Sequence, residues 1–209
     1  MQKSPLITTA RMEAFSDGVI AILITIMVFD LKLNELPTEL NVWKDLQLLL
    51  PKFISYALSF LVIAIMWINH HHLLHQVSHT DHQQLWYNIL LLFFMSLIPF
   101  ATNFIGSNPL LAQSSLVYGL IFAGCSVSFF LLRHHAATSG KMPGAATAGT
   151  ATGGARRKNF LSIGLYLAGA GLAFSSVYLS FICFVLVPAL YFFPQRIQAP
   201  TPASPQDGQ

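Results

Sequence analysis

The sequence predicts an all-α membrane protein with six spanning helices, and three observations support this fold class. Hydrophobic residues make up 54% of the 209 residues, charged residues make up only 9%, and the mean hydropathy is +0.59. Soluble domains carry roughly 25% charged residues, so this composition suits a chain surrounded mostly by lipid. The apolar residues also gather in runs long enough to cross about 30 Å of hydrocarbon as helices.

The apolar runs give the predicted spans in order. The first four lie at about residues 12–33, 53–74, 85–105 and 110–132. A longer apolar run follows at residues 160–193 and would be about 51 Å long as one helix, too long for one crossing. Ser175 and Ser176 lie near its middle. We therefore expect a turn there between two shorter helices, at about 158–175 and 177–193.

Residues 1–196 would then form one six-helix transmembrane domain. Within it, the leucine and tryptophan residues of segment 40–50 fall on one helical face and its charged residues on another. This segment is either an interfacial helix or an N-terminal extension of the second span. Gly, Ala and Thr dominate residues 138–156, which we expect to form a flexible loop, and Pro, Ser and Gln dominate residues 197–209, which we expect to be a disordered tail.

Basic residues are distributed unevenly between the two sides that six crossings define. Of the 11 Lys and Arg residues, only Lys32, Lys44 and Lys52 fall on the side opposite the termini. Short cytoplasmic loops of membrane proteins carry an excess of Lys and Arg. The distribution therefore predicts that both termini lie in the cytoplasm.

Several functional classes lack support in the sequence. The basic residues form no stripe with interleaved aromatic residues, so we expect no nucleic-acid partner. The sequence contains no phosphate-binding glycine loop, no HExxH motif and no Ser or Cys beside an obvious base, so we expect no enzymatic activity. Cys125 and Cys183 both fall inside apolar spans, where packing is their expected role.

Charged and polar side chains enter the first span at its N-terminal end. With the topology above, Asp17 lies at about the same depth as polar residues of the second and third spans. A buried carboxylate needs hydrogen-bond donors, and imidazole and amide groups at its own level can supply them. We expect a polar cluster that fastens the inner ends of the first three helices, rather than a proton relay, formed by Arg11, Ser16, Asp17, His70 or His71, and Asn88.

The histidines between the second and third spans suggest a possible metal site. His71, His75 and His79 are spaced by four and would share one face of a continuous helix. The segment from Ser78 to Asp81 resembles a turn, however, and no Cys or Glu in this stretch completes a tetrahedral site. We therefore expect no bound metal here and interpret the segment as a solvated interfacial loop.

The first span has a second patterned face. Val19, Ile22, Ile26 and Phe29 follow helical spacing, and Thr25 lies one turn above Ile22. If copies of this helix surrounded a common axis, the face would form apolar rings and one ring of hydroxyl groups. Such rings can gate an ion path and replace part of an ion's water shell. Ordinary helix packing explains the same periodicity.

The segment from Arg11 to Ile22 reads R-x-x-x-F-S-D-x-x-x-A-I. This motif resembles the signature of the transmembrane protein 175 family, the endosomal and lysosomal potassium channels. The resemblance extends over the first half of the chain, through Trp67–His71, Leu85–Asn88 and Pro99–Phe100. One copy of the signature is present, as in the prokaryotic members, which implies a homotetramer in the cell (inner) membrane with four first helices around one pore.

The resemblance also implies roles for individual residues. Ile22 would form the hydrophobic constriction, Thr25 the selective hydroxyl layer, and Ile26 and Phe29 further apolar layers; a phenylalanine at this outer layer departs from the family's pattern. No cofactor is implied beyond the permeant potassium ion, and no Thr-Val-Gly-Tyr-Gly filter occurs. The signature residues would hold the pore helices from behind, and they are Arg11, Phe15, Ser16, Asp17, Trp67, Asn69, His70, His71 and Asn88.

Two alternatives to a passive potassium channel stay open on the residues alone. The first is a proton-coupled or metal-ion transporter that uses Asp17 and the histidines. The second is a membrane scaffold that conducts no ions.

Overall fold

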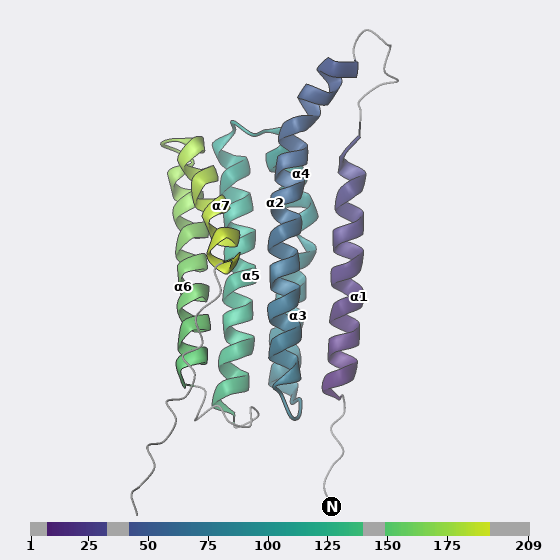
Figure 1. Ribbon diagram of the computed structural model, residues 1–209, viewed down its shortest axis with the longest axis vertical. Helices are drawn as coiled ribbons and strands as arrows, with labels where there is room; N and C mark the ends of the chain where they lie inside the picture. Colours follow the sequence, from purple (N-terminus) through teal and green to yellow (C-terminus); the bar gives the residue numbers. More distant parts are fainter. Residues whose placement is uncertain (1–7, 33–41, 140–148, 193–209) are drawn as a thin grey trace, which may run out of the picture.

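The structure is a computed structural model that describes residues 8–32, 42–139 and 149–192. All of its elements are helical, and they stand side by side in one bundle (Figure 1). In chain order they are α1 (Thr9–Met27), the 3-10 turn η1 (Val28–Asp30), α2 (Val42–His75), α3 (His82–Ser96), α4 (Ile98–Ser107), α5 (Ala112–Thr138), α6 (Gly149–Leu172) and α7 (Val177–Phe192). The predicted all-α fold is confirmed.

Among the described residues, four helical stretches are long and apolar enough to cross a membrane. They are Thr9–Asp30, Leu46–His75, His82–Ser107 and Ala112–Thr138, and α7 is a shorter apolar helix. The third stretch joins α3 to α4 and is interrupted at Leu97, where Pro99 lies in the first turn of α4. Proline has no N–H to donate and is tolerated at such a position. With α3 and α4 as one span, the described part of the chain has the six predicted helices of a multi-pass membrane protein.

The second span is longer than predicted at its N-terminal end. α2 runs without interruption from Val42 through Pro51 to His75, so segment 42–50 extends the span instead of forming a separate interfacial helix. Its upper part leans out of the bundle (Figure 1). Pro51 cannot donate a backbone hydrogen bond to the preceding turn, which favours a bend there.

The last two helices are joined near the predicted turn. Backbone N–H groups of Ser175 and Ser176 both bond to the carbonyl of Leu172, and α7 begins at Val177. α6 begins at Gly149, so residues 149–156 are helical where the sequence predicted a loop. Adding residues to an existing helix requires no new nucleation, which explains this extension. The predicted tail, residues 197–209, lies outside the described residues.

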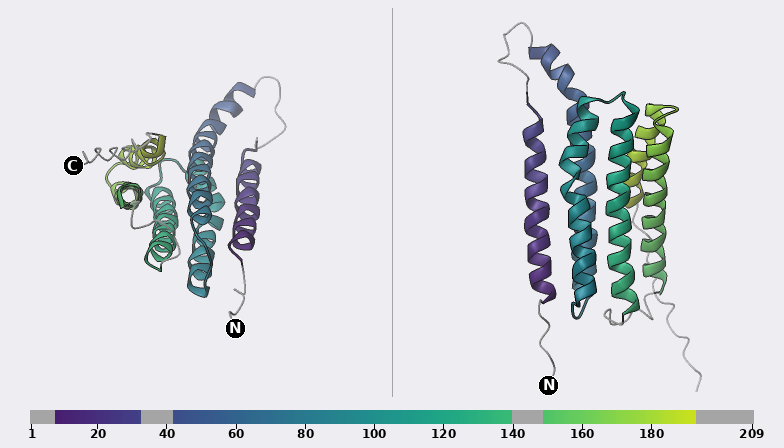
Figure 2. Two further views of the ribbon diagram at one scale, coloured as in Figure 1. Left: turned by 60° about the horizontal axis from the view of Figure 1, so that its bottom comes forward. Right: turned by 180° about the vertical axis from the view of Figure 1, so that it is seen from behind.

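α1 lies at one edge of the bundle, and α6 and α7 lie at the other (Figure 2). α1 packs against α2, α3 and α4. At the opposite side of the bundle, α5, α6 and α7 bring together the rings of Tyr118, Phe122, Tyr166 and Phe184, each at most 1% exposed. α1 is therefore a peripheral helix that contributes only one face to the core.

Close helix packing depends on Gly119 of α5. A Cβ at this position would lie 2.7 Å from the carbonyl oxygen of Tyr166 and 2.9 Å from the Cβ of Ala170, both on α6. Small residues permit this backbone approach in lipid. Two glycines of α6 differ in how closely their neighbours approach. A Cβ at Gly169 would meet the Phe184 ring, whereas a Cβ at Gly164 would have no neighbour within 4 Å among the described residues.

We expect Gly119→Ala to destabilise the protein because the added methyl group would collide with the α6 backbone. Overpacking of this kind costs ~1–3 kcal/mol. Thermal unfolding of the purified protein in detergent measures the effect. Gly164→Ala is the matched control and should leave the melting temperature unchanged or slightly higher. If both variants melted with the wild type, the close approach of α5 and α6 would be contradicted.

Candidate functional site

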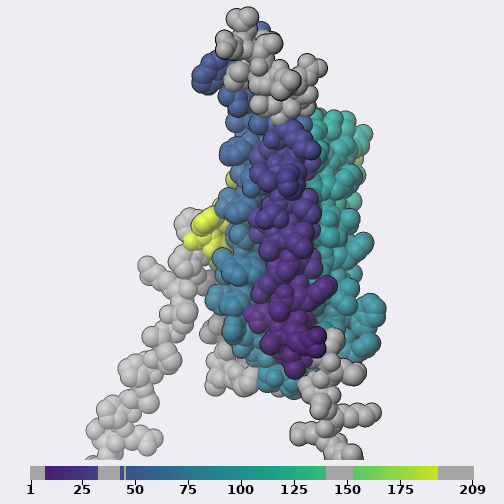
Figure 3. Space-filling view, turned by 90° about the vertical axis from the view of Figure 1, so that its right-hand side faces the viewer, coloured from purple at the N-terminus to yellow at the C-terminus, as the bar shows by residue number. Residues whose placement is uncertain are grey.

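α1 has two clearly different faces. One face is buried against the bundle through Met12, Ser16, Ile20, Leu23 and Met27, which recur at helical spacing. The opposite face is open along the length of α1, as Figure 3 shows for the purple helix. An apolar helix that buries only one stripe leaves the other face for lipid or for another protein chain.

The open face carries large apolar side chains and one hydroxyl group. Ile22 is 57% exposed, Ile26 is 45% exposed, and Phe29, in η1, is 65% exposed. The Thr25 hydroxyl donates to the carbonyls of Ile22, at 2.9 Å, or Ala21, at 3.1 Å. Because its own proton is used inside the helix, the Thr25 oxygen keeps lone pairs that can accept from water or coordinate a cation.

The buried face is fastened by a chain of hydrogen bonds across three helices. Asn88 of α3 donates from Nδ2 to the Ser16 hydroxyl at 2.9 Å, and Ser16 donates to the carbonyl of Met12. His70 Nε2 of α2 lies 2.8 Å from Asn88 Oδ1. Since the Asn88 oxygen only accepts, His70 must carry its proton on Nε2. The three side chains are at most 2% exposed, so water does not compete for these bonds.

Two further contacts join α1 to α2, one helical turn apart on both helices. The Trp67 indole N–H donates to Asp17 Oδ1 at 2.8 Å, and one turn closer to the N-terminus His71 Nδ1 lies 2.8 Å from Glu13 Oε1. The two helices are antiparallel, so a step of four residues up α1 matches a step of four residues down α2. These contacts fix both the height and the rotation of α1.

Both ends of this segment are held as well. At the N-terminal end, the hydroxyls of Thr9 and Thr80 are 2.9 Å apart. At the other end, Asn103 of α4 donates to Asp30 Oδ1 at 2.6 Å. Between these two ends the middle of α1 is held by apolar packing of Ile20 and Leu23 against the core.

Three of the predicted anchor residues lie apart from this network. Arg11 and Phe15 are on the exposed face and line an open pocket of about 350 Å3 beside α3. The Asn69 amide donates to the carbonyl of Ile65 in its own helix. Glu13 was not among the residues predicted to hold α1. Its spacing of four from Asp17 matches the spacing of His71 from Trp67, and this match could have indicated the contact.

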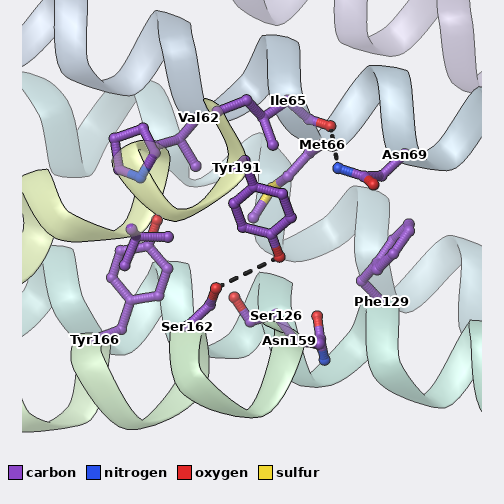
Figure 4. Close-up of a pocket in the computed structure, with 12 residues that line it drawn as sticks. Val62, Ile65, Met66, Asn69, Ser126, Phe129, Asn159, Ser162, Tyr166 and Tyr191 are labelled. Carbon is purple, nitrogen blue, oxygen red and sulfur yellow. Dashed lines mark hydrogen bonds between the residues drawn. The ribbon is translucent and has the colours of Figure 1, made fainter. Parts of the chain in front are cut away.

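A second cavity lies inside the bundle, between α2, α5, α6 and α7 (Figure 4). It has a volume of about 30 Å3, room for one or two water molecules. The Ser162 hydroxyl points to the Tyr191 hydroxyl across it at 3.4 Å (Figure 4). None of its lining residues belongs to α1. This cavity is too small to serve as a path for hydrated ions through the subunit.

Comparison with known proteins places the chain among membrane channels. Residues 11–99 match the family described as the endosomal/lysosomal potassium channel TMEM175. A potassium channel of Chryseobacterium sp. (strain P1-3) is 33% identical over 193 residues, which cover 90% of this chain and 95% of that protein. The endosomal/lysosomal proton channel TMEM175 of Rattus norvegicus is 32% identical over 99 residues, covering 44% of this chain and 20% of the rat protein.

A solved structure agrees with these relationships. The crystal structure of a lysosomal potassium-selective channel TMEM175 homolog from Chamaesiphon minutus superposes with a TM-score of 0.75. The two chains are 33% identical, and the match covers 88% of this chain and 96% of the other. The likeness therefore includes the helices of the second half of the chain, where the sequence offered only hydropathy.

We expect Asn88→Ala to destabilise the attachment of α1, because it would leave Ser16 and His70 buried without their shared partner. Interhelical hydrogen bonds in membranes are worth ~0.6–2 kcal/mol. The apparent melting temperature in detergent should fall accordingly. Asn69→Ala is the control, since its amide bonds only within its own helix, and it should have a smaller effect. Equal melting temperatures for the two variants would argue against the interhelical bond.

Proposed function

The chain belongs to the TMEM175 family of potassium channels, and we propose that it conducts potassium passively through a pore that four copies build from their α1 helices. The observation that carries this proposal is the open face of α1, where a hydroxyl lies between large apolar side chains. The opposite face of the same helix is fastened to the bundle by buried hydrogen bonds. The path is expected between copies because the two pockets described between α2, α5, α6 and α7, of about 30 and 290 Å3, have no lining residue on α1.

The proposed gate is the ring that Ile22 forms around the central axis. Narrow apolar constrictions stop ions by excluding water. Ile26 and Phe29 follow along the same face, so Phe29 lies about 10 Å beyond Ile22 at 1.5 Å per residue. Phe29 adds bulk at this outer layer and would narrow the pore there as well.

Thr25 is the proposed selectivity residue. Its oxygen lies between the apolar layers and has lone pairs directed away from the helix, because its proton bonds to the carbonyls of Ala21 and Ile22. Four such oxygens around an axis would replace part of the water shell of an ion. Potassium loses its water more easily than sodium, so a narrow ring of this kind favours potassium.

A coupled transporter that uses Asp17 is less well supported. Asp17 lies beside α2 and accepts a hydrogen bond from Trp67 at 2.8 Å, so its role is to hold α1 in place.

The four copies would lie in the cell (inner) membrane. Both termini would lie in the cytoplasm, as the distribution of Lys and Arg favours.

We expect Thr25→Val to reduce the potassium-to-sodium permeability ratio by about fivefold, because a methyl group replaces an oxygen worth ~1 kcal/mol of coordination. Reversal potentials of the purified protein in planar bilayers measure this ratio. Thr138→Val is a matched control, since Thr138 is also exposed and bonds to carbonyls of its own helix. Thr138→Val should retain the wild-type ratio. An unchanged ratio in Thr25→Val would refute the proposed role of Thr25.

We expect Ile22→Ala to increase the resting potassium conductance several-fold, because a smaller side chain widens the apolar constriction and keeps it hydrated. The same bilayer recordings measure it. Ile182→Ala serves as the control, since Ile182 is 55% exposed on α7, far from α1. If Ile22→Ala conducted like the wild type, the gate would have to lie at another layer.

A further inference from the structure

Three metal-ligating side chains meet between α1 and α2, near the end of the bundle that carries the N-terminus. Glu13 Oε1 lies 2.8 Å from His71 Nδ1 and 3.8 Å from His75 Nε2. One ligand atom from each residue falls within 4.8 Å of the others. Glu13 supplies the carboxylate that the histidine segment itself lacks.

The two helices hold these groups in a fixed arrangement. His71 and His75 occupy successive turns of α2, and their ring centroids are 4.3 Å apart at an angle of 77°. Trp67 stacks on the other side of His71 at 5.8 Å. Glu13 reaches them from α1, which the Asp17–Trp67 bond keeps in register. The set does not include His79, because α2 ends at His75 and His79 bonds to Ser78 instead.

We propose that Glu13, His71 and His75 form a site for a first-row transition-metal ion such as Zn²⁺. Zn²⁺ binds His nitrogen and Glu oxygen at about 2.0–2.2 Å, which places tetrahedral ligand atoms about 3.4 Å apart. The distances of 2.8 and 3.8 Å lie on either side of this value, so small side-chain rotations would suffice.

The surroundings favour an ion that arrives from solvent. The exposed fractions of the Glu13, His71 and His75 side chains are 20%, 40% and 64%, so a water molecule can take the fourth position. Two imidazoles select Zn²⁺ or Ni²⁺ over Mg²⁺ and Ca²⁺, which prefer oxygen ligands. The ion would link α1 directly to α2, and bound metal would therefore stabilise the folded chain by mass action.

Calorimetric titration of the purified full-length protein with Zn²⁺ tests the site without any ion current. We expect about one Zn²⁺ per chain, a higher melting temperature with Zn²⁺ than with Mg²⁺, and tetrahedral absorption bands with Co²⁺. His75→Ala and Glu13→Gln should each weaken Zn²⁺ binding by about 100-fold. His72→Ala removes an exposed imidazole from the same turn of α2 and should bind Zn²⁺ like the wild type.

Two results would overturn the site. One is wild-type protein whose melting temperature and heat of titration respond to Zn²⁺ no more than to Mg²⁺. The other is equal Zn²⁺ affinity in His72→Ala and His75→Ala, which would indicate nonspecific binding to surface histidines.

A regulatory role of the site rests on the proposed function, because α1 would line the pore. We expect Zn²⁺ to alter the potassium current of the wild type and of His72→Ala but not that of His75→Ala. An unchanged wild-type current would overturn the regulatory role while the titration still decides on binding. Absence of any current in metal-free buffer would instead count against the proposed function.

Discussion

Buried hydrogen bonds from α2 and α3 attach α1 to the bundle and set its orientation. Lipid tails are as apolar as leucine side chains, so moving apolar surface from lipid into a helix interface lowers the free energy only slightly. Helices in membranes therefore associate through close packing and hydrogen bonds. α1 stands at the edge of the bundle, where one of its faces packs against α2, α3 and α4 and the opposite face is open (Figure 3). The buried bonds from Asn88 to Ser16 and from His70 to Asn88 therefore decide which face of α1 turns outward. Everything proposed for Ile22 and Thr25 follows from that orientation.

In the proposed pore, the division between the two faces of α1 also separates the residues that stabilise the fold from those that would contact ions. The two carboxylates of α1 lie on the bundle side. Asp17 accepts a hydrogen bond from Trp67, and Glu13 contacts His71. From Gly18 to Phe29 the outward side offers only apolar groups and the Thr25 oxygen. A permeant cation on that side would meet no fixed charge in the middle of the span, so it would not be trapped there.

Much of this arrangement was predictable because the bilayer imposes it. Hydropathy gave the spans, since their length follows from the thickness of the hydrocarbon layer. Comparing depths across helices correctly grouped Ser16, His70 and Asn88. The depth of a residue does not indicate how its helix is rotated about its own axis. The prediction therefore missed the outward positions of Arg11 and Phe15 and the contact of Glu13 with His71. The early start of α6 at Gly149 was missed because local composition does not reveal how far a neighbouring helix propagates.

The two ends of α1 are tied by side-chain bonds, Thr9 to Thr80 below and Asp30 to Asn103 above. Within the described part of the chain, the stretch around Ile20 and Leu23 is held by apolar contacts alone. The contacts of Ser16 with Asn88 and of Asp17 with Trp67 mark the lower limit of this stretch, and the bond between Asp30 and Asn103 marks its upper limit. Ile22 lies between these limits. In the proposed pore, a small outward bow of α1 between them would move Ile22 while leaving the polar contacts intact, and the bore would change without any helix leaving its place in the bundle.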